Sequence, residues 1–235
     1  MLQTLMDSKT TYRARGSRRA AWKAAMAACL VVVLPSASAL AAPASAPAPQ
    51  LTPDQLVREV TQDVLEAVHH DKALQAGDKQ KALALAEQKV LPHFDFRQMT
   101  RLTVGRPWAG ATPAQRDQLV EGFRSLIVRT YANSIGAYHG QTMKVQPLHM
   151  APNATDVTVR NLYLSPGKAP IPVDYSMSKG PDGWKIYDIV VDGVSLVLTY
   201  RSQFREEIQR AGVPGLIKEL DAKNEQAAAP GGDAR

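Results

Sequence analysis

The chain has 235 residues, 45% of them hydrophobic, and a formal net charge of +6. Residues 1–41 hold six Lys and Arg residues against one Asp, so residues 42–235 carry 22 basic and 21 acidic side chains and are close to neutral. Nucleic-acid binding draws on an excess of basic side chains, so this balance argues against that function. The single cysteine, Cys29, lies in the first segment, which excludes a disulfide framework.

The first 41 residues have the pattern of a cleaved export signal. Basic side chains between residues 13 and 23 precede the apolar run 24–34, and Ala39-Leu40-Ala41 fits the small-residue rule for cleavage. The apolar run is too short for a membrane span, which takes about 20 residues. We therefore predict a signal peptide over residues 1–41. The adjacent Arg18 and Arg19 fit a twin-arginine signal and an ordinary Sec leader equally well.

The rest of the chain has the length of one domain with a sizeable core. Residues 42–50, APASAPAPQ, are expected to form a Pro/Ala linker that does not pack. Residues 225–235 are expected to be a disordered tail. The predicted domain covers residues 51–224.

Helical signals dominate from residue 52 to residue 140. Thr52-Pro53-Asp54 combines an N-cap hydroxyl, a proline at the first helical position and an early acid. A second helix is predicted over about 78–90 and a short third one over 94–102. Thr112-Pro113-Ala114-Gln115 opens the longest helix with a capping-box glutamine, and this helix is predicted to end at Gly140.

Beyond residue 140 the apolar period changes from 3.6 to 2, which indicates strands. Strands are predicted at 143–148, 156–164, 171–178 and 184–191, and the short turns between them predict an antiparallel meander. Two helices, over about 194–211 and 214–223, close the domain. The predicted fold is therefore α+β, with a helical N-terminal half, a four-stranded antiparallel sheet and two C-terminal helices. The longest helix is expected to cover one face of a curved sheet.

Residues 183–204, GWKIYDIVVDGVSLVLTYRSQF, contain the most apolar strand. Simple alternation places Trp184, Ile186 and Val190 on one face of that strand and Tyr187, Ile189 and Val191 on the other. A strand that is apolar on both faces needs cover on both. The second cover is either the segment that follows Gly193 or a ligand.

Candidate reactive groups are few. The histidines (His69, His70, His93, His139 and His149) lack the spacing of a metal site, so neither a metal nor a cofactor is expected. Ser195 lacks the second glycine of a G-x-S-x-G elbow and is interpreted as a helix N-cap. Asp188, between apolar neighbours, is the one catalytic candidate; a carboxylate bonded to backbone or to an arginine is the preferred interpretation.

The pattern Trp-Lys-x-Tyr-Asp from Trp184, with Gly-Val-Ser-Leu from Gly193, resembles the MlaC family, the toluene-tolerance Ttg2D type. Further similar segments are Leu91-Pro92-x-Phe94-Asp95-Phe96, Val104-Gly105-Arg106-x-Trp108, Phe123 to Tyr131 with Tyr138-x-Gly140, Pro170 to Tyr175, and Val213-x-Gly215-Leu216. Together they span about residues 51–223.

The resemblance implies a soluble periplasmic carrier that encloses phospholipid acyl chains in an apolar cavity between sheet and helices. It implies a cone-shaped scaffold of the NTF2 or cystatin kind. It also implies shuttling between an outer-membrane lipoprotein–porin complex and an inner-membrane ABC transporter with an MCE-domain ring, which maintains outer-membrane lipid asymmetry. Phospholipid is then cargo, no catalysis is implied, and nothing demands more than a monomer.

The strand pattern and this implication together predict the residues of the site. The cavity wall is expected to consist of Tyr131, Ile135, Val157, Val159, Val173, Tyr175, Ile189, Val191, Val197 and Phe204. Arg201 and Arg205 are expected at its rim, near a phosphate headgroup, although solvated helix charges explain them equally well.

Two other functions stay open at this level. One is an NTF2-like periplasmic enzyme that uses Asp188 with Tyr187 or a histidine. The other is a carrier or chaperone for different apolar cargo, such as lipoproteins, sterol-like lipids or aromatic solvents.

Overall fold

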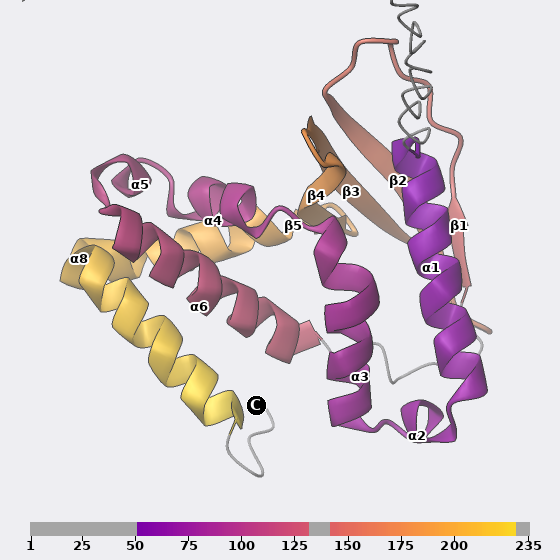
Figure 1. Ribbon diagram of the computed structural model, residues 1–235, viewed down its shortest axis with the longest axis horizontal. Helices are drawn as coiled ribbons and strands as arrows, with labels where there is room; N and C mark the ends of the chain where they lie inside the picture. Colours follow the sequence, from indigo (N-terminus) through magenta and orange to yellow (C-terminus); the bar gives the residue numbers. More distant parts are fainter. Residues whose placement is uncertain (1–50, 132–141, 229–235) are drawn as a thin grey trace, which may run out of the picture. The chain divides into compact units, whose positions relative to one another are not determined.

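The computed structural model describes residues 51–131 and 142–228 (Figure 1). All of these residues belong to one compact unit, within Pro47–Arg235. The predicted signal peptide and linker therefore lie outside the described residues. No helix within the described ranges is long and apolar enough to cross a membrane.

Residues 142–195 form an antiparallel sheet of five strands in the order β1-β2-β3-β4-β5. The strands are β1 (Thr142–Val145), β2 (Asp156–Leu164), β3 (Ile171–Gly180), β4 (Gly183–Val191) and β5 (Val194–Ser195). The predicted meander and α+β class are confirmed. The two-residue β5 was not predicted; the positive φ angles of Asp192 (48°) and Gly193 (80°) form the tight turn that folds it back onto β4.

A β-bulge in β4 changes which side chains face the core. Ser176 of β3 pairs with Asp188, but the next residue, Met177, pairs with Ile186, so Tyr187 is an extra residue on β4. A bulge moves the following side chains to the opposite face from the one that simple alternation gives.

The face of Ile189 and Val191 follows from this register. Ile189 pairs with Tyr175, and Val191 pairs with Val173, so both share the face of Ile186. The sequence-based assignment of Ile189 and Val191 to the face of Tyr187 was wrong, because one inserted residue reverses the alternation.

Helix α1 (Pro53–His70) covers the inner face of the sheet, as Figure 1 shows. Val57 of α1 packs in one core with Val145, Val159, Met177 and other inward side chains of the strands. This is a correction, because α6 (Pro113–Tyr131), the helix predicted to be the longest, was expected here. Only the tertiary packing decides which amphipathic helix takes which apolar surface.

Helix α6 packs instead against α4 (Phe96–Val104) and α8 (Leu196–Ala228) in a second, helical core. The aromatic rings of Phe123, Tyr200 and Phe204 form its centre, with centroids 5.2 to 5.9 Å apart. The predicted capping box of α6 is present, since the side chains of Thr112 and Gln115 each accept a hydrogen bond from the other's backbone N–H (3.2 and 2.9 Å). The short α5 (Pro107–Gly110) lies between the predicted third helix and α6.

Helix α8 consists of two helical halves joined at Gly212, whose φ of 67° lies outside the helical region. This break matches the two predicted C-terminal helices. The second half extends to Ala228, so residues 225–228, predicted as disordered, are helical; residues 229–235 lie outside the described range.

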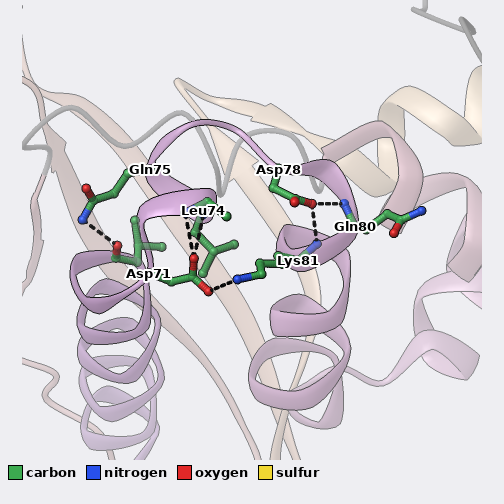
Figure 2. Close-up of polar contacts among 8 residues, drawn as sticks. Asp71, Leu74, Gln75, Asp78, Gln80 and Lys81 are labelled. Atoms are coloured by element: carbon green, nitrogen blue, oxygen red, sulfur yellow. Dashed lines mark hydrogen bonds and ion pairs between the residues drawn. The ribbon is translucent and has the colours of Figure 1, made fainter.

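Aspartates fix the turns between α1, α2 (Lys72–Gln75) and α3 (Lys79–Leu85) (Figure 2). Asp71 accepts a hydrogen bond from the backbone N–H of Leu74 (3.3 Å) and another from Nζ of Lys81 (2.6 Å), which lowers the pKa of the Asp71 carboxyl. Asp78 accepts a bond from the backbone N–H of Lys81 (3.0 Å). These caps hold α1 and α3 as a helical hairpin.

Helix α3 continues into a π-helical turn, η1 (Ala86–Val90), and a 3-10 turn, η2 (Leu91–His93). The predicted helix over 78–90 is thus present, but its last turn is wider than an α-helix. The chain is then anchored to β4, because Asp95 N–H donates to the carbonyl of Ile186 (2.8 Å). Phe94, predicted to begin α4, lies in this bridge, and α4 begins at Phe96.

Candidate functional site: an apolar cavity between sheet and helices

An apolar cavity of about 500 Å³ lies where η1, the ends of α6 and β4, and the start of α8 meet. This volume falls within the range of about 300–1,000 Å³ that is typical of ligand pockets. The residues that line it are Ala86, Val90, Leu91, Phe94, Phe96, Ile127, Val128, Tyr131, Ile189, Val191, Val194, Leu196 and Thr199. Among these described lining residues, only Tyr131 and Thr199 contribute polar side-chain atoms.

The local structure of each wall explains why these side chains converge. The bulge at Tyr187 turns Ile189 and Val191 inward, and the tight turn after them returns Val194 to the same edge. The wide π-helical turn presents Ala86 and Val90 on the opposite side. π-Helical turns of this kind occur often at functional sites.

Exposed side chains, most of them apolar, surround the opening of the cavity to solvent. Tyr131, Val191 and Val194 are 45%, 46% and 62% exposed, although all three line the cavity. Exposed large apolar groups at the mouth of a cavity mark a surface that binds apolar ligand or partner.

A smaller cavity of about 160 Å³ adjoins the first, between α1 and the sheet. Val90, Phe94 and Ile189 line both cavities and therefore form the partition between them. The other residues of the smaller one are Leu56, Val57, Val60, Thr61, His93, Tyr175 and Ile186.

Two ionisable side chains of the smaller cavity, His93 and Tyr175, favour their neutral forms. Burial, helped by Lys185, lowers the pKa of His93, and burial raises the pKa of Tyr175 to about 12. Within the described residues, neither cavity is lined by Asp, Glu, Lys or Arg. The paired cavities are thus uncharged near neutral pH.

Four of the predicted wall residues line these cavities: Tyr131, Ile189 and Val191 the larger one, and Tyr175 the smaller. Val159, Val197 and Phe204 are instead fully packed in the two cores. Val157 borders a separate, polar hollow of about 470 Å³ with Asp156 and Arg160. Val173 lines none of these spaces, and Ile135 lies outside the described residues.

Arg201 and Arg205, predicted at the rim, line neither cavity. Arg201 lies against Gly105 at the end of α4, where a β carbon on the glycine would be 3.6 Å from Nη2 of the arginine. The two arginines therefore occupy the α4 side of α8, away from the cavity wall that Leu196 and Thr199 form.

The sequence analysis did not predict that the N-terminal helical part of the domain contributes to the cavity wall. Ala86, Val90, Phe94 and Phe96 come from the segment around η1, which was predicted as parts of the second and third helices without a role in the site. The Leu91-Pro92-x-Phe94-Asp95-Phe96 motif was the available signal. Its proline interrupts the helix, and its apolar side chains are then free to line a cavity instead of a regular helix face.

The candidate catalytic groups have structural roles. Ser195 Oγ donates to Asp188 (2.6 Å) and accepts from the N–H of Leu198 (3.0 Å), while Asp188 also accepts from the N–H of Val197 (3.0 Å). Both side chains thus cap the N-terminus of α8, which confirms the N-cap and backbone-bonded interpretations. Across the described residues, no three His, Cys, Asp or Glu side chains gather as metal ligands.

The fold and the cavities define a class of protein: an α+β domain that holds an apolar, ligand-sized space between a bulged antiparallel sheet and its helices. Residues 58–222 match the family described as MlaC protein. That match covers most of the domain, and the chain belongs to the MlaC family.

Individual relatives agree with this assignment. The chain is 29% identical over 124 residues to toluene tolerance protein ttg2D of Pseudomonas putida, an alignment that spans 50% of this chain and 57% of that protein. It is 19% identical over 180 residues to the intermembrane phospholipid transport system binding protein MlaC of Haemophilus influenzae, covering 75% of this chain and 84% of the relative.

A solved structure is also similar. It is that of a phospholipid-binding protein from Ralstonia solanacearum in complex with a phospholipid, with 40% sequence identity and a TM-score of 0.68. The similarity covers 74% of this chain and 97% of that chain.

Proposed function

We propose that this protein binds phospholipid through its acyl chains in the two adjoining cavities and carries it between membranes. The observation that carries the proposal is the wall of the larger cavity, whose described residues are apolar except for Tyr131 and Thr199. The related Ralstonia solanacearum protein, solved with a phospholipid, supports the same ligand class.

The energetics of acyl chains explain why such a cavity suits a carrier. Each buried methylene is worth about 0.8 kcal/mol, so a chain of about sixteen carbons contributes roughly 12 kcal/mol before the costs of binding. Lipid held this strongly almost never leaves into water unaided. A carrier must therefore release its cargo by docking to a partner that accepts the chains directly.

We further propose the cellular setting that family membership implies. The protein would act in the periplasm after removal of its predicted signal peptide. It would exchange phospholipid between an outer-membrane lipoprotein–porin complex and an inner-membrane ABC transporter with an MCE-domain ring, and so maintain outer-membrane lipid asymmetry.

Native mass spectrometry of protein purified from the periplasm tests the binding step. We expect a bound mass that matches diacyl phospholipid. Ala86→Trp and Thr199→Trp each place an indole in the larger cavity and should reduce bound lipid about tenfold or more. Thr199 is exposed at the cavity wall. We therefore expect the Thr199→Trp variant to fold with the larger side chain. Ala114→Trp, at an exposed position on α6, is the matched control and should keep its lipid.

The outcomes separate the alternatives. A bound mass that matches another apolar molecule would support a carrier of different cargo. Wild-type lipid content in both cavity variants would refute the assignment of these cavities. The enzyme alternative requires a substrate whose turnover is lost in Asp188→Asn, whereas a carrier retains its lipid in that variant.

A further inference from the structure

Arg101, Arg106, Arg201 and Arg205 come from the segments of the chain around the turn between α4 and α5. Figure 1 shows this turn at the end of the helices away from α1 and the sheet. Arg101 lies one turn before Gly105, whose N–H it bonds through its carbonyl, and Arg106 follows Gly105 directly. Arg201 of α8 lies against the same glycine, and Arg205 is one helical turn further along α8. These four residues are called the arginine face below.

The charges of the arginine face have no acidic partner among the residues that the structure describes. All four side chains belong to exposed residues, and among the described residues none forms an ion pair. Two other arginines nearby, Arg97 and Arg116, do have partners within the domain. Arg97 pairs with Asp117, and Arg116 donates to the carbonyl of Trp108 (3.0 Å) while its guanidinium lies over the Trp108 ring.

The lipid cavities do not explain this cluster. None of the four arginines lines a cavity, and the Val104-Gly105-Arg106-x-Trp108 motif lies outside both cavity walls. The first turns of α8 nevertheless connect the two regions, since Thr199 lines the larger cavity and Arg201 follows two residues later.

We propose that the arginine face is a docking surface for an acidic face of a partner protein. Guanidinium groups bind carboxylates in a fixed, bidentate geometry, which gives orientation as well as attraction. The predicted mature chain is close to neutral, so four clustered charges attract a partner to one place on it. The inference rests on the proposed function only in that a carrier needs a partner to receive its cargo.

A membrane surface is a poorer match for the arginine face. Peripheral membrane binding combines basic groups with several apolar side chains that insert into the lipid. Among the exposed large hydrophobic residues of the described chain, Leu198 alone lies on α8, and the others lie on α6, on the strands or in the loop after β1. One leucine gives little apolar area for insertion.

The test compares the wild type with a variant in which Arg101, Arg106, Arg201 and Arg205 are all changed to Gln. The control replaces four exposed cations of the sheet region, Lys144, Arg160, Lys168 and Lys179, with Gln, which removes the same charge. The probes are a short polyglutamate peptide and phosphatidylcholine vesicles with about one-third phosphatidylglycerol. Affinities are measured between about 0.05 and 0.2 M salt.

We expect the arginine-face variant to lose about tenfold or more in affinity for polyglutamate at low salt, and most of the salt dependence. The control should lose much less, and vesicles should bind all three proteins equally weakly. Equal losses in the two variants, or a loss confined to the vesicles, would overturn the proposal. Bound lipid, measured by native mass spectrometry, should be the same in all three, so a lipid-free wild type would count against the proposed function alone.

Discussion

Asp188 and Ser195 satisfy the first backbone N–H groups of α8 as one unit. Ser195 Oγ bonds to the Leu198 N–H and to Asp188, and Asp188 bonds to the Val197 N–H. The Tyr-Asp and Gly-Val-Ser-Leu positions of the family resemblance therefore include the device that starts the helix on the cavity's edge.

Removing this device should cost stability. Asp188→Ala and Ser195→Ala are each expected to lower the free energy of unfolding by about 1 kcal/mol, as for other N-cap losses. Because the two side chains share a hydrogen bond, the double variant should lose less than the sum. Urea unfolding measures this, with Glu206→Ala, an exposed position on α8, as the control. Fully additive losses would show that the two groups act independently.

At the scale of elements, the β4 bulge and the break in α8 determine where apolar side chains go. The bulge supplies Ile189 and Val191 to the larger cavity. The break at Gly212 turns α8 back so that Leu216 and Leu220 reach the helical core beside α6. Gly122 of α6 permits this approach, since a β carbon there would lie 3.1 Å from the β carbon of Leu220.

The break in α8 also depends on the absence of a side chain at residue 215. A β carbon on Gly215 would lie 2.2 Å from the β carbon of Ala211, so Gly215→Ala forces the two halves of the helix apart. We expect it to lower the free energy of unfolding by about 1–3 kcal/mol. Gly110→Ala, where a β carbon meets nothing within 4 Å, should be neutral or slightly stabilising. Thermal unfolding distinguishes the two, and equal effects would contradict the close contact.

At the scale of the whole molecule, the exposed apolar mouth of the larger cavity is unfavourable in water, and lipid bound as proposed would offset this cost. Ligand that binds only the folded state stabilises it by about 2.7 kcal/mol at a hundred times its dissociation constant. Under the proposed function, we therefore expect the lipid-free protein to be less stable than the lipid-bound one.

Removal of lipid by denaturation and refolding should lower the Tm of the wild type by roughly 5–10 °C, because 1 kcal/mol shifts Tm by about 2–4 °C at this size. Adding phospholipid back should restore it. Thr199→Trp should show a much smaller shift in differential scanning calorimetry. A Tm that is the same with and without lipid would mean that the cavities are not filled in the folded protein.

Local patterns were enough to predict the α+β class, the meander, the capping box of α6 and the break in α8. Each follows from neighbours in the chain: the Thr112–Gln115 pair, the turns at Pro and Gly, and the Gly212 interruption. The site was predicted less completely. Tyr131, Tyr175, Ile189 and Val191 line the cavities, but the π-helical wall was missed because an α-helix and a π-helical turn have similar apolar patterns over a few residues.

The amino-acid sequence by itself therefore determined the elements, their order and the apolar character of the strand from Trp184 to Val191. The tertiary structure alone decided which face of that strand meets the cavity, because the bulge at Tyr187 arises from pairing with β3. It likewise decided that α1 rather than α6 covers the sheet, and that Arg201 lies beside Gly105 rather than at the cavity rim. The apolar periodicity of the sequence indicates which side chains are buried, but only the folded chain decides which residues they pack against.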